Sequence, residues 1–327
     1  KDKGYGEDKV NIEYQNAQGD FGTAQTIATS YAQGGKDLVL AVSTPSAQAM
    51  YNASKDIPIV ITAVTDPVSV GLTGENITGT SDMAPVDKQV DLINALLPET
   101  KTIGVVYNTS EENSLVLVEK LKAESGRYGY KVVEKGITNI NEVGQALDVI
   151  LKEIDVLYTP TDNLIVASTP IVLEKANAEN VPVIGCIDDQ VKQGAVATET
   201  LDYKQLGYQT GEIAVRILNG EEPKDIPVQT LKNTKLMINK VAAERLNIEI
   251  PEGTIEQSLI FAIMVMGVYI SFRILDFPDM TVDGSFPMGA AIVASCLVKG
   301  INPVLALIIA FLGGALAGFI TGFIHVK

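Results

Sequence analysis

The chain has 327 residues, which is enough for about two domains of ordinary size. Acidic residues outnumber basic ones by 40 to 25, and this net charge of −15 argues against a nucleic-acid partner, because phosphate-binding surfaces are basic. Residues 253–327 carry only three basic and four acidic side chains, a net charge of −1. We therefore expect an acidic globular part followed by a membrane-embedded part, which excludes a purely cytosolic protein.

Short apolar runs alternate with amphipathic helical patterns through the first 252 residues. The runs show little polar alternation, which is typical of parallel strands buried on both faces. The predicted strands are 10–14, 38–42, 59–64, 102–107, 131–135, 156–158, 181–186 and 235–239. Apolar residues at helical spacing over 86–97 and 143–151 supply the crossovers that parallel strands need. This alternation predicts an α/β fold with doubly wound sheets.

The predicted elements fall into two lobes, with a first crossing at the proline-containing segment 96–101. The helical pattern at 203–218 is assigned to the first lobe, and the strand and helix at 235–246 to the second. The expected lobes are therefore about 1–98 with 200–230, and about 99–199 with 231–252. The run at 10–14 matches the second strand of a doubly wound sheet, whose first strand is central. A sheet without its middle strand leaves backbone groups unpaired on both neighbouring strands, so a complete lobe would need that strand. No residues before 10–14 match it, and we therefore expect that the given sequence starts inside the first lobe and lacks its first strand.

Small polar residues gather where the predicted strands end, and open α/β sheets bind ligands at the carboxyl ends of their strands. The candidate ligand-binding residues are Ser43, Thr44, Ser46, Thr65, Asp66, Asn108, Ser110, Asn113, Thr161, Asp162, Asp188 and Asp189. Hydroxyls and helix N-termini would hold an anion, and the aspartates would hold a cation, a combination that suits a zwitterion. Ordinary helix caps and turns use the same residue types, so that alternative stays open.

Motifs for catalysis are absent from the sequence. There is no nucleophile elbow and no phosphate-binding glycine loop with lysine, and the only histidine, His325, lies two residues from the end. Cys186 and Cys296 fall in the two different parts, which argues against a disulfide framework or a metal cluster. We expect a binding protein that is not an enzyme and uses no cofactor or metal.

The tail contains long apolar runs. Residues 257–275 would span roughly one hydrocarbon core at about 1.5 Å per residue, 301–326 form a second run, and 285–298 form a shorter one. Glycines at 314, 318 and 322 recur every four residues, a spacing that lets transmembrane helices pack closely. We expect an all-α transmembrane segment that begins a longer membrane domain, and the few Lys and Arg residues leave its orientation open.

The first 252 residues resemble the substrate-binding proteins of ABC importers, specifically the tryptophan/tyrosine-type family with the type I periplasmic-binding fold. The matching stretches are AVSTPSAQA (41–49), ITAVTDPV (61–68), NITGTSDMAP (76–85), LLPETKTIGVVYNTSEENS (96–114), VLYTPTDN (156–163) and GCIDDQ (185–190). The tail at 253–327 resembles the amino-terminal quarter of the cognate permease, most clearly in GVYISFRILDFPDMTVDGSFPMGAA (267–291).

The resemblance implies a two-lobed clamp outside the cell membrane that captures a small zwitterion, an aromatic amino acid first of all, and delivers it to the permease. Separate ATPase subunits would supply the energy. Carried over by position, the ligand carboxylate would be held by Ser43, Thr44, Ser46 and Thr65. The amino group would be bound by Asp162 and Asp188. The second lobe would close on the ligand through Asn108, Ser110 and Asn113.

Other functions and ligands stay open at this point. A membrane-tethered sensor could use the same clamp and would have a signalling domain after the tail, whereas an importer would have further membrane spans. An enzyme acting on an amino acid could use the same scaffold. Tyr107 and Tyr158 could stack on an aromatic ligand or belong to the core, and branched-chain amino acids or another small acid remain possible ligands.

Overall fold

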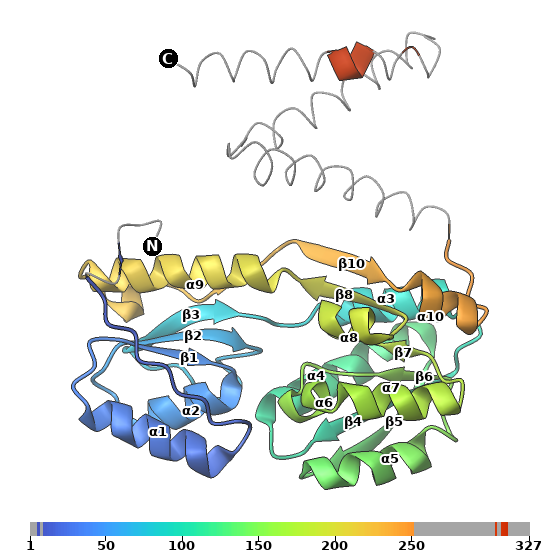
Figure 1. Cartoon of the computed structure of the whole chain (residues 1–327), viewed down its shortest axis with the longest axis horizontal. Helices are drawn as coiled ribbons and strands as arrows, with labels where there is room; N and C mark the ends of the chain where they lie inside the picture. The colour runs from blue at the N-terminus through green and yellow to red at the C-terminus, as the bar shows by residue number, and fades with distance from the viewer. Residues whose placement is uncertain (1–4, 7–8, 252–304, 306–308, 313–327) are drawn as a thin grey trace. The chain divides into compact units, whose positions relative to one another are not determined.

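The computed structural model describes residues 5–6, 9–251, 305 and 309–312 (Figure 1). The chain divides into two compact units, Lys1–Ile250 and Pro251–Lys327. The predicted membrane spans and the glycine repeat of the tail lie almost wholly outside the described residues. Within the described ranges, no helix is both long enough and apolar enough to cross a membrane.

Two sheets organise the described part of the first unit. Sheet A is parallel and has the order β1-β2-β3-β9, with β1 (Val39–Val42), β2 (Ile59–Val64), β3 (Ile77–Ser81) and β9 (Gln229–Thr230). Sheet B has the order β10-β8-β7-β6-β4-β5, with β4 (Thr102–Asn108), β5 (Lys131–Ile137), β6 (Val156–Tyr158), β7 (Val183–Ile184), β8 (Ala197–Leu201) and β10 (Thr234–Ile238). In sheet B only the β10–β8 pair is antiparallel.

Helices cover both faces of each sheet (Figure 1). On sheet A, one face is covered by α1 (Phe21–Gln33) and α2 (Thr44–Ala53), and the other by α9 (Tyr203–Leu218). On sheet B, one face is covered by α3 (Val86–Leu96), α4 (Glu112–Ser125) and α10 (Lys240–Arg245). The other face is covered by α5 (Val143–Ile150), α6 (Asn163–Ala167), α7 (Thr169–Ala178) and α8 (Asp188–Gln193). The 3-10 turns are η1 (Gly126–Tyr128), η2 (Ile140–Glu142) and η3 (Pro223–Asp225).

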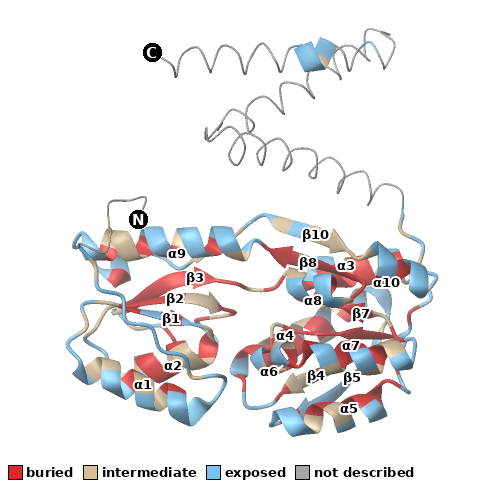
Figure 2. Cartoon of the chain, in the orientation of Figure 1, coloured by how far each residue is buried: buried red, intermediate tan, exposed pale blue. Residues whose placement is uncertain are grey.

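Apolar side chains from alternate strand positions fill separate cores, and these are the buried regions of Figure 2. In β2, Ile59 and Ile61 pack toward α1 and α2, whereas Val60 packs toward α9. In β4, Val105 packs toward α3 and α4, whereas Val106 packs toward α5. This alternation is what a strand with two buried faces requires, and it explains why the strands read as continuous apolar runs.

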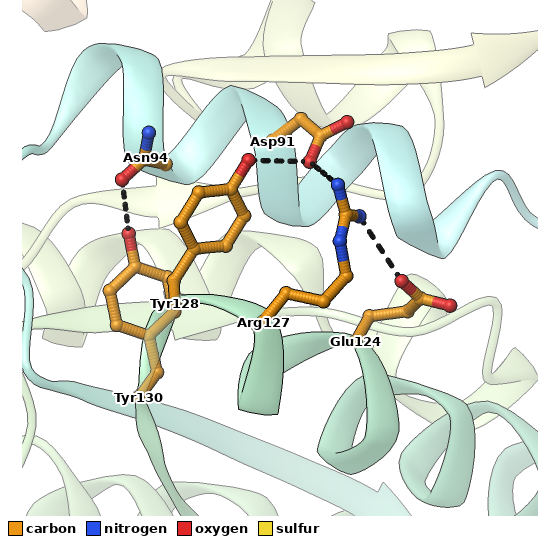
Figure 3. Close-up of polar contacts among 6 residues, drawn as sticks. All are labelled: Asp91, Asn94, Glu124, Arg127, Tyr128 and Tyr130. Atoms are coloured by element: carbon orange, nitrogen blue, oxygen red, sulfur yellow. Dashed lines mark hydrogen bonds and ion pairs between the residues drawn. The ribbon is translucent and has the colours of Figure 1, made fainter.

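Polar contacts attach α3 to the second lobe (Figure 3). The Tyr128 hydroxyl donates to Asp91 Oδ1 at 2.8 Å, and the Tyr130 hydroxyl donates to Asn94 Oδ1 at 3.1 Å. Arg127 forms an ion pair with Asp91 at 2.9 Å. The rings of Tyr128 and Tyr130 stack with their centroids 5.6 Å apart. Because Asp91 and Asn94 belong to α3, these contacts join α3 to the segment that follows α4.

The first crossing between lobes therefore lies before α3, at residues 82–85, and the prediction of a crossing at 96–101 is wrong. The apolar face of α3 packs into the core of the second lobe through residues such as Val90 and Ile93. Pro98 only ends that helix ahead of β4. The chain crosses again between β8 and α9, and a third time between β9 and β10.

The predicted strand at 10–14 is not a strand in the structure, where these residues are irregular and largely exposed. Ile12 and Tyr14 are 84% and 81% exposed. Among the described strands β1 pairs with β2 alone, so it forms the edge of sheet A. The segment at 10–14 thus has no neighbouring strand to supply the hydrogen bonds that an extended chain needs.

β3, β8 and β9 were not predicted, and β3 shows why. Its sequence Ile-Thr-Gly-Thr-Ser looks polar, yet all five residues are buried. The hydroxyls are satisfied within the protein: Thr78 donates to Ile226 O at 2.6 Å, and Ser81 donates to Thr65 O at 2.7 Å. Thr80 lies 2.8 Å from the hydroxyl of Thr210 on α9. Hydroxyls with internal partners can be buried at little cost, so a search for apolar runs overlooks such a strand.

Candidate ligand-binding site

The carboxyl ends of the two sheets meet through α2 and α4. Gln48 Nε2 on α2 donates to Glu112 Oε2, the first residue of α4, at 2.9 Å. α2 follows β1 directly, and α4 follows β4 after a short loop. This contact brings the loops after β1 and β4 near one another, at the edge where open α/β sheets bind ligands.

The start of α2 carries three of the predicted ligand-binding residues. Ser43, just before the helix, has φ 74° and ψ 156°, a backbone conformation that is costly for any residue other than glycine. Its N–H donates to Thr62 O at 3.0 Å, and its side chain does not cap the helix. The first-turn N–H groups, together with the nearby hydroxyls of Thr44 and Ser46, thus lie at the carboxyl end of β1.

A buried carboxylate lies beside Thr65, and the sequence analysis missed it. Asp82 follows β3 and is only 4% exposed. Tyr203 OH donates to Asp82 Oδ2 at 2.9 Å, and Thr65 Oγ1 donates a longer hydrogen bond to Asp82 Oδ1 at 3.4 Å. Burial raises the pKa of Asp82, and these hydrogen bonds offset only part of that effect. Burial likewise raises the pKa of Tyr203 well above its usual value, and the Asp82 charge raises it further.

Asp66 differs from Thr65 in its hydrogen bonds. Its Oδ1 accepts hydrogen bonds from the N–H groups of Val68 at 3.1 Å and Ser69 at 3.2 Å, so the carboxylate closes its own turn. Thr65 and Asp66 both line a cavity of about 560 Å³ beside β3 and β9. The predicted role of Asp66 in ligand binding does not follow from this geometry.

Asp162 is fully buried and holds three segments of the second lobe together. Its Oδ1 caps α6 by accepting from the N–H of Ile165 at 2.9 Å. Its Oδ2 accepts from the N–H of Asn108 at 2.6 Å and from the Ser114 hydroxyl at 2.7 Å. Burial and then the nearby Glu111 charge raise the pKa of Asp162. Because protein donors occupy both oxygens, the geometry gives Asp162 a structural role, and its contact with a ligand amino group stays a prediction.

Asn108, Ser110, Asn113 and Thr161 form one polar cluster with Glu111, a buried acid that the sequence analysis also missed. Asn108 Oδ1 accepts from the N–H of Ser110 at 3.0 Å, and Asn108 Nδ2 donates to Glu111 Oε1 at 3.2 Å. Asn113 Nδ2 donates to Thr161 O at 3.1 Å. Asn113 Oδ1 and Thr161 Oγ1 are buried polar atoms that have no hydrogen-bond partner in the described protein. Such atoms are costly unless a further molecule satisfies them.

Asp188 and Asp189 begin α8, and both pair with Lys192, at 3.1 Å and 2.7 Å. The Asp188 side chain is 33% exposed and that of Asp189 is 66% exposed. The charge of Asp188 contributes to the raised pKa of Tyr203, which indicates that Asp188 lies near the Asp82 region. Asp189 lies on the surface.

The two candidate aromatic residues belong to the second lobe's interior. Tyr158 is fully buried, and its hydroxyl donates to Gln89 Oε1 at 2.7 Å. Tyr107 is half-buried and packs against the same core. Both side chains therefore contribute to packing, the alternative left open for them above.

Comparison with known proteins identifies two family matches. The profile of the family described as ABC transporter substrate binding protein matches residues 1–258. The profile described as branched-chain amino acid transport system / permease component matches residues 250–327.

Two proteins of Clostridioides difficile (strain R20291) are similar to the two parts. The first, named Tyrosine-binding protein, is 48% identical over 256 residues, which cover 76% of this chain and 74% of the relative. The second, named Tyrosine transport system permease protein, is 58% identical over 71 residues, which cover 22% of this chain and 24% of the relative. The chain thus spans about a quarter of the length of this permease relative.

A solved structure resembles the first unit. It is the ABC domain from Streptococcus pneumonia in complex with L-Trp, with 35% sequence identity and a TM-score of 0.76. The matched region covers 78% of this chain and 88% of the chain in the solved structure. This likeness confirms the predicted type I periplasmic-binding-like α/β fold. The family matches also confirm that the two parts resemble a binding protein and a permease.

Proposed function

Because the chain belongs to the ABC transporter substrate binding protein family, we propose that its two lobes bind a free aromatic amino acid, with L-tyrosine as the preferred ligand. The identity of 48% over 256 residues with a protein named Tyrosine-binding protein is the observation that carries this proposal. The related structure that holds L-Trp supports an aromatic amino acid as the ligand class. The transport family favours an importer over a membrane-tethered sensor, and binding would involve no covalent step.

The ligand would lie between the carboxyl ends of the two sheets. Its carboxylate would face the start of α2, where Thr44 and Ser46 offer N–H groups and Ser43 adds a hydroxyl. From the second lobe, the unpartnered oxygens of Asn113 and Thr161 would complete the polar shell. Asn108 and Ser110 position this edge.

The match of residues 250–327 to a permease component supports a function in which capture and membrane passage begin in one chain. We place residues 1–252 on the extracytoplasmic side of the cell membrane and residues 253–327 in a permease domain. Separate ATPase subunits would drive transport, as in ABC transporters generally.

Calorimetric titration of the full chain in detergent against the twenty amino acids tests this proposal. We expect saturable one-to-one binding of L-tyrosine and at least about tenfold weaker binding of the aliphatic amino acids, since a buried aromatic ring contributes several times the area of a methyl group. Absence of binding to every amino acid would contradict the proposal. Tightest binding of an aliphatic amino acid would contradict the assigned ligand class.

The Gln48–Glu112 hydrogen bond between the lobes leads to a prediction about ligand affinity. Replacing Gln48 with alanine removes one polar contact, which contributes about 1 kcal/mol, and should raise the Kd for L-tyrosine about fivefold, mainly through faster dissociation. The melting temperature should stay within about 2 °C of the wild type, because the contact is exposed. Stopped-flow binding with tyrosine fluorescence measures the dissociation rate.

Glu112→Gln is the matched control, since glutamine at this position still accepts from Gln48. Its Kd should remain within about twofold of the wild type, whereas Glu112→Ala should reproduce the effect of Gln48→Ala. Equal dissociation rates in all four proteins would show that this contact contributes nothing to closure.

A further inference from the structure

Asp82 lies where the chain passes between the lobes. It directly follows β3 and opens the first crossing, and Tyr203 opens α9 directly after the second crossing. The hydrogen bond from Tyr203 OH to Asp82 Oδ2, at 2.9 Å, therefore connects two of the three crossings. Ser81 and Met83 line the cavity beside β9, whereas the Asp82 side chain reaches Tyr203, as alternation along an extended chain predicts.

The surroundings of Asp82 supply no positive charge. Among the residues that the structure describes, its side chain is contacted by the hydroxyls of Tyr203 and Thr65 and forms no ion pair with a lysine or arginine. The charge of Asp82 also acts on the buried thiol of Cys186, another group that would be negative if ionised. A buried carboxylate with this environment is unfavourable unless it is protonated or a cation compensates it.

Asp82 also has free acceptor capacity. A carboxylate offers about four lone-pair positions, and here the hydroxyls of Tyr203 and Thr65, at 2.9 Å and 3.4 Å, and the backbone N–H of Asp82 itself leave part of that capacity unused. The rival acids differ in this respect. Asp162 already accepts from three donors, and the charge of Asp188 is paired with Lys192.

We propose that the Asp82 carboxylate binds the α-ammonium group of the bound amino acid, with Thr65 and Tyr203 holding the carboxylate in position. This inference rests on the proposed function and assigns the cation half of the zwitterion site. The ammonium group has three donors and one positive charge, which match the unused acceptor positions and the uncompensated charge of Asp82. The ligand carboxylate would then point toward the start of α2, where Ser43 and Thr65 follow adjacent strands of sheet A.

A thermodynamic cycle that combines a change in the protein with a change in the ligand tests the pairing of Asp82 with the ammonium group. The Kd values of L-tyrosine and of 3-(4-hydroxyphenyl)propanoate, which lacks the amino group, are measured on the full chain in detergent, with wild type and Asp82→Asn. In the wild type, loss of the amino group should weaken binding on the order of 100-fold, as expected for a buried charge pair. In D82N the two ligands should bind within about threefold of each other, because asparagine keeps the size and the acceptor for Tyr203 but carries no charge.

Two control variants separate charge recognition from a structural role. Tyr203→Phe removes the hydrogen bond but keeps the carboxylate, so the preference for the amino-bearing ligand should remain above about tenfold. Asp188→Asn should leave that preference at the wild-type value. A preference that survives in D82N, or that disappears in Asp188→Asn, overturns the assignment of Asp82.

If D82N is unfolded at 25 °C, Asp82→Glu supplies the same test, since the charge is kept but displaced by one methylene. L-tyrosine should then lose affinity by more than about tenfold while the amine-free ligand changes by less than about threefold. Equal losses for both ligands would overturn the assignment. If the wild type binds neither ligand, the proposed function fails; if it binds L-tyrosine and only the cycle shows no coupling, this inference alone fails.

Discussion

Replacing Asp162 with alanine is expected to lower the free energy of unfolding of the first unit by at least about 3 kcal/mol. The substitution leaves three buried donors, the N–H groups of Asn108 and Ile165 and the hydroxyl of Ser114, without their acceptor. Each buried unsatisfied group costs about 1–3 kcal/mol. The three donors lie at the end of β4, in α4 and in α6, so the loss would loosen the whole ligand-facing edge of the second lobe. Urea unfolding followed by tyrosine fluorescence measures the change.

Asp189→Ala is the matched control for this effect. The Asp189 carboxylate is two-thirds exposed and pairs with Lys192, and exposed ion pairs contribute about 0–1 kcal/mol. Its unfolding midpoint should remain close to the wild type. An Asp162→Ala protein that unfolds within about 1 kcal/mol of the wild type would contradict the structural role of this carboxylate and revive its predicted role at the ligand.

Replacing Gly79 with alanine is expected to destabilise the first lobe by at least about 3 kcal/mol. Gly79 lies in the middle of the buried strand β3 with φ 148°, a conformation in which other residues are strained. A Cβ atom there would lie 2.0 Å from the carbonyl oxygen of Ile61 on the neighbouring strand. Displacing backbone atoms within a sheet breaks its hydrogen bonds, so β3 and β2 would have to separate at a large energetic cost. Thermal unfolding of the first unit measures the loss.

Gly207→Ala provides a control on α9. Apart from its chain neighbours and the backbone of its own helix, no atom lies within 4 Å of the position that its Cβ would take, and glycine in a helix costs up to about 1 kcal/mol relative to alanine. This variant should be as stable as the wild type or slightly more stable. A Gly79→Ala protein with an unchanged melting temperature would show that the close approach of β2 and β3 is not as the structure describes it.

The fold class could be predicted because buried parallel strands leave a simple pattern. The apolar runs at 59–64 and 156–158 coincide with β2 and β6, since both faces of these strands are covered by helices. The pattern fails for β3, where hydroxyl groups with internal partners replace apolar side chains. It also fails at 10–14, where an apolar run has no strand beside it.

The position of the first crossing between the lobes could not be predicted from helix-ending residues alone. Pro98 marks the end of a helix, but only the packing of Val90 and Ile93 shows that the helix belongs to the second lobe. Proline limits local backbone geometry and carries no information about which sheet a helix covers. Tertiary contacts decide that, and they are spread over distant segments of the chain.

The candidate site was predicted in part, for a similar reason. Strand ends identify Ser43 and Thr65, because open α/β sheets present ligand groups there. Asp82 was missed because β3, the strand that it follows, was itself not recognised. Asp162 was predicted as a ligand residue, yet its hydrogen-bond partners lie up to 54 positions away in the chain and were not visible in the sequence. Residue type and strand ends predict where polar groups gather, and packing decides which of them remain available.

Equilibrium dialysis of radiolabelled L-tyrosine against the full chain in detergent tests the central claim most directly. We expect saturable binding of one tyrosine per chain, displaced by excess unlabelled L-tyrosine and poorly displaced by tyramine, which lacks the carboxylate. Absence of saturable binding, or equal displacement by tyrosine and tyramine, would contradict a clamp that recognises the zwitterion of an aromatic amino acid.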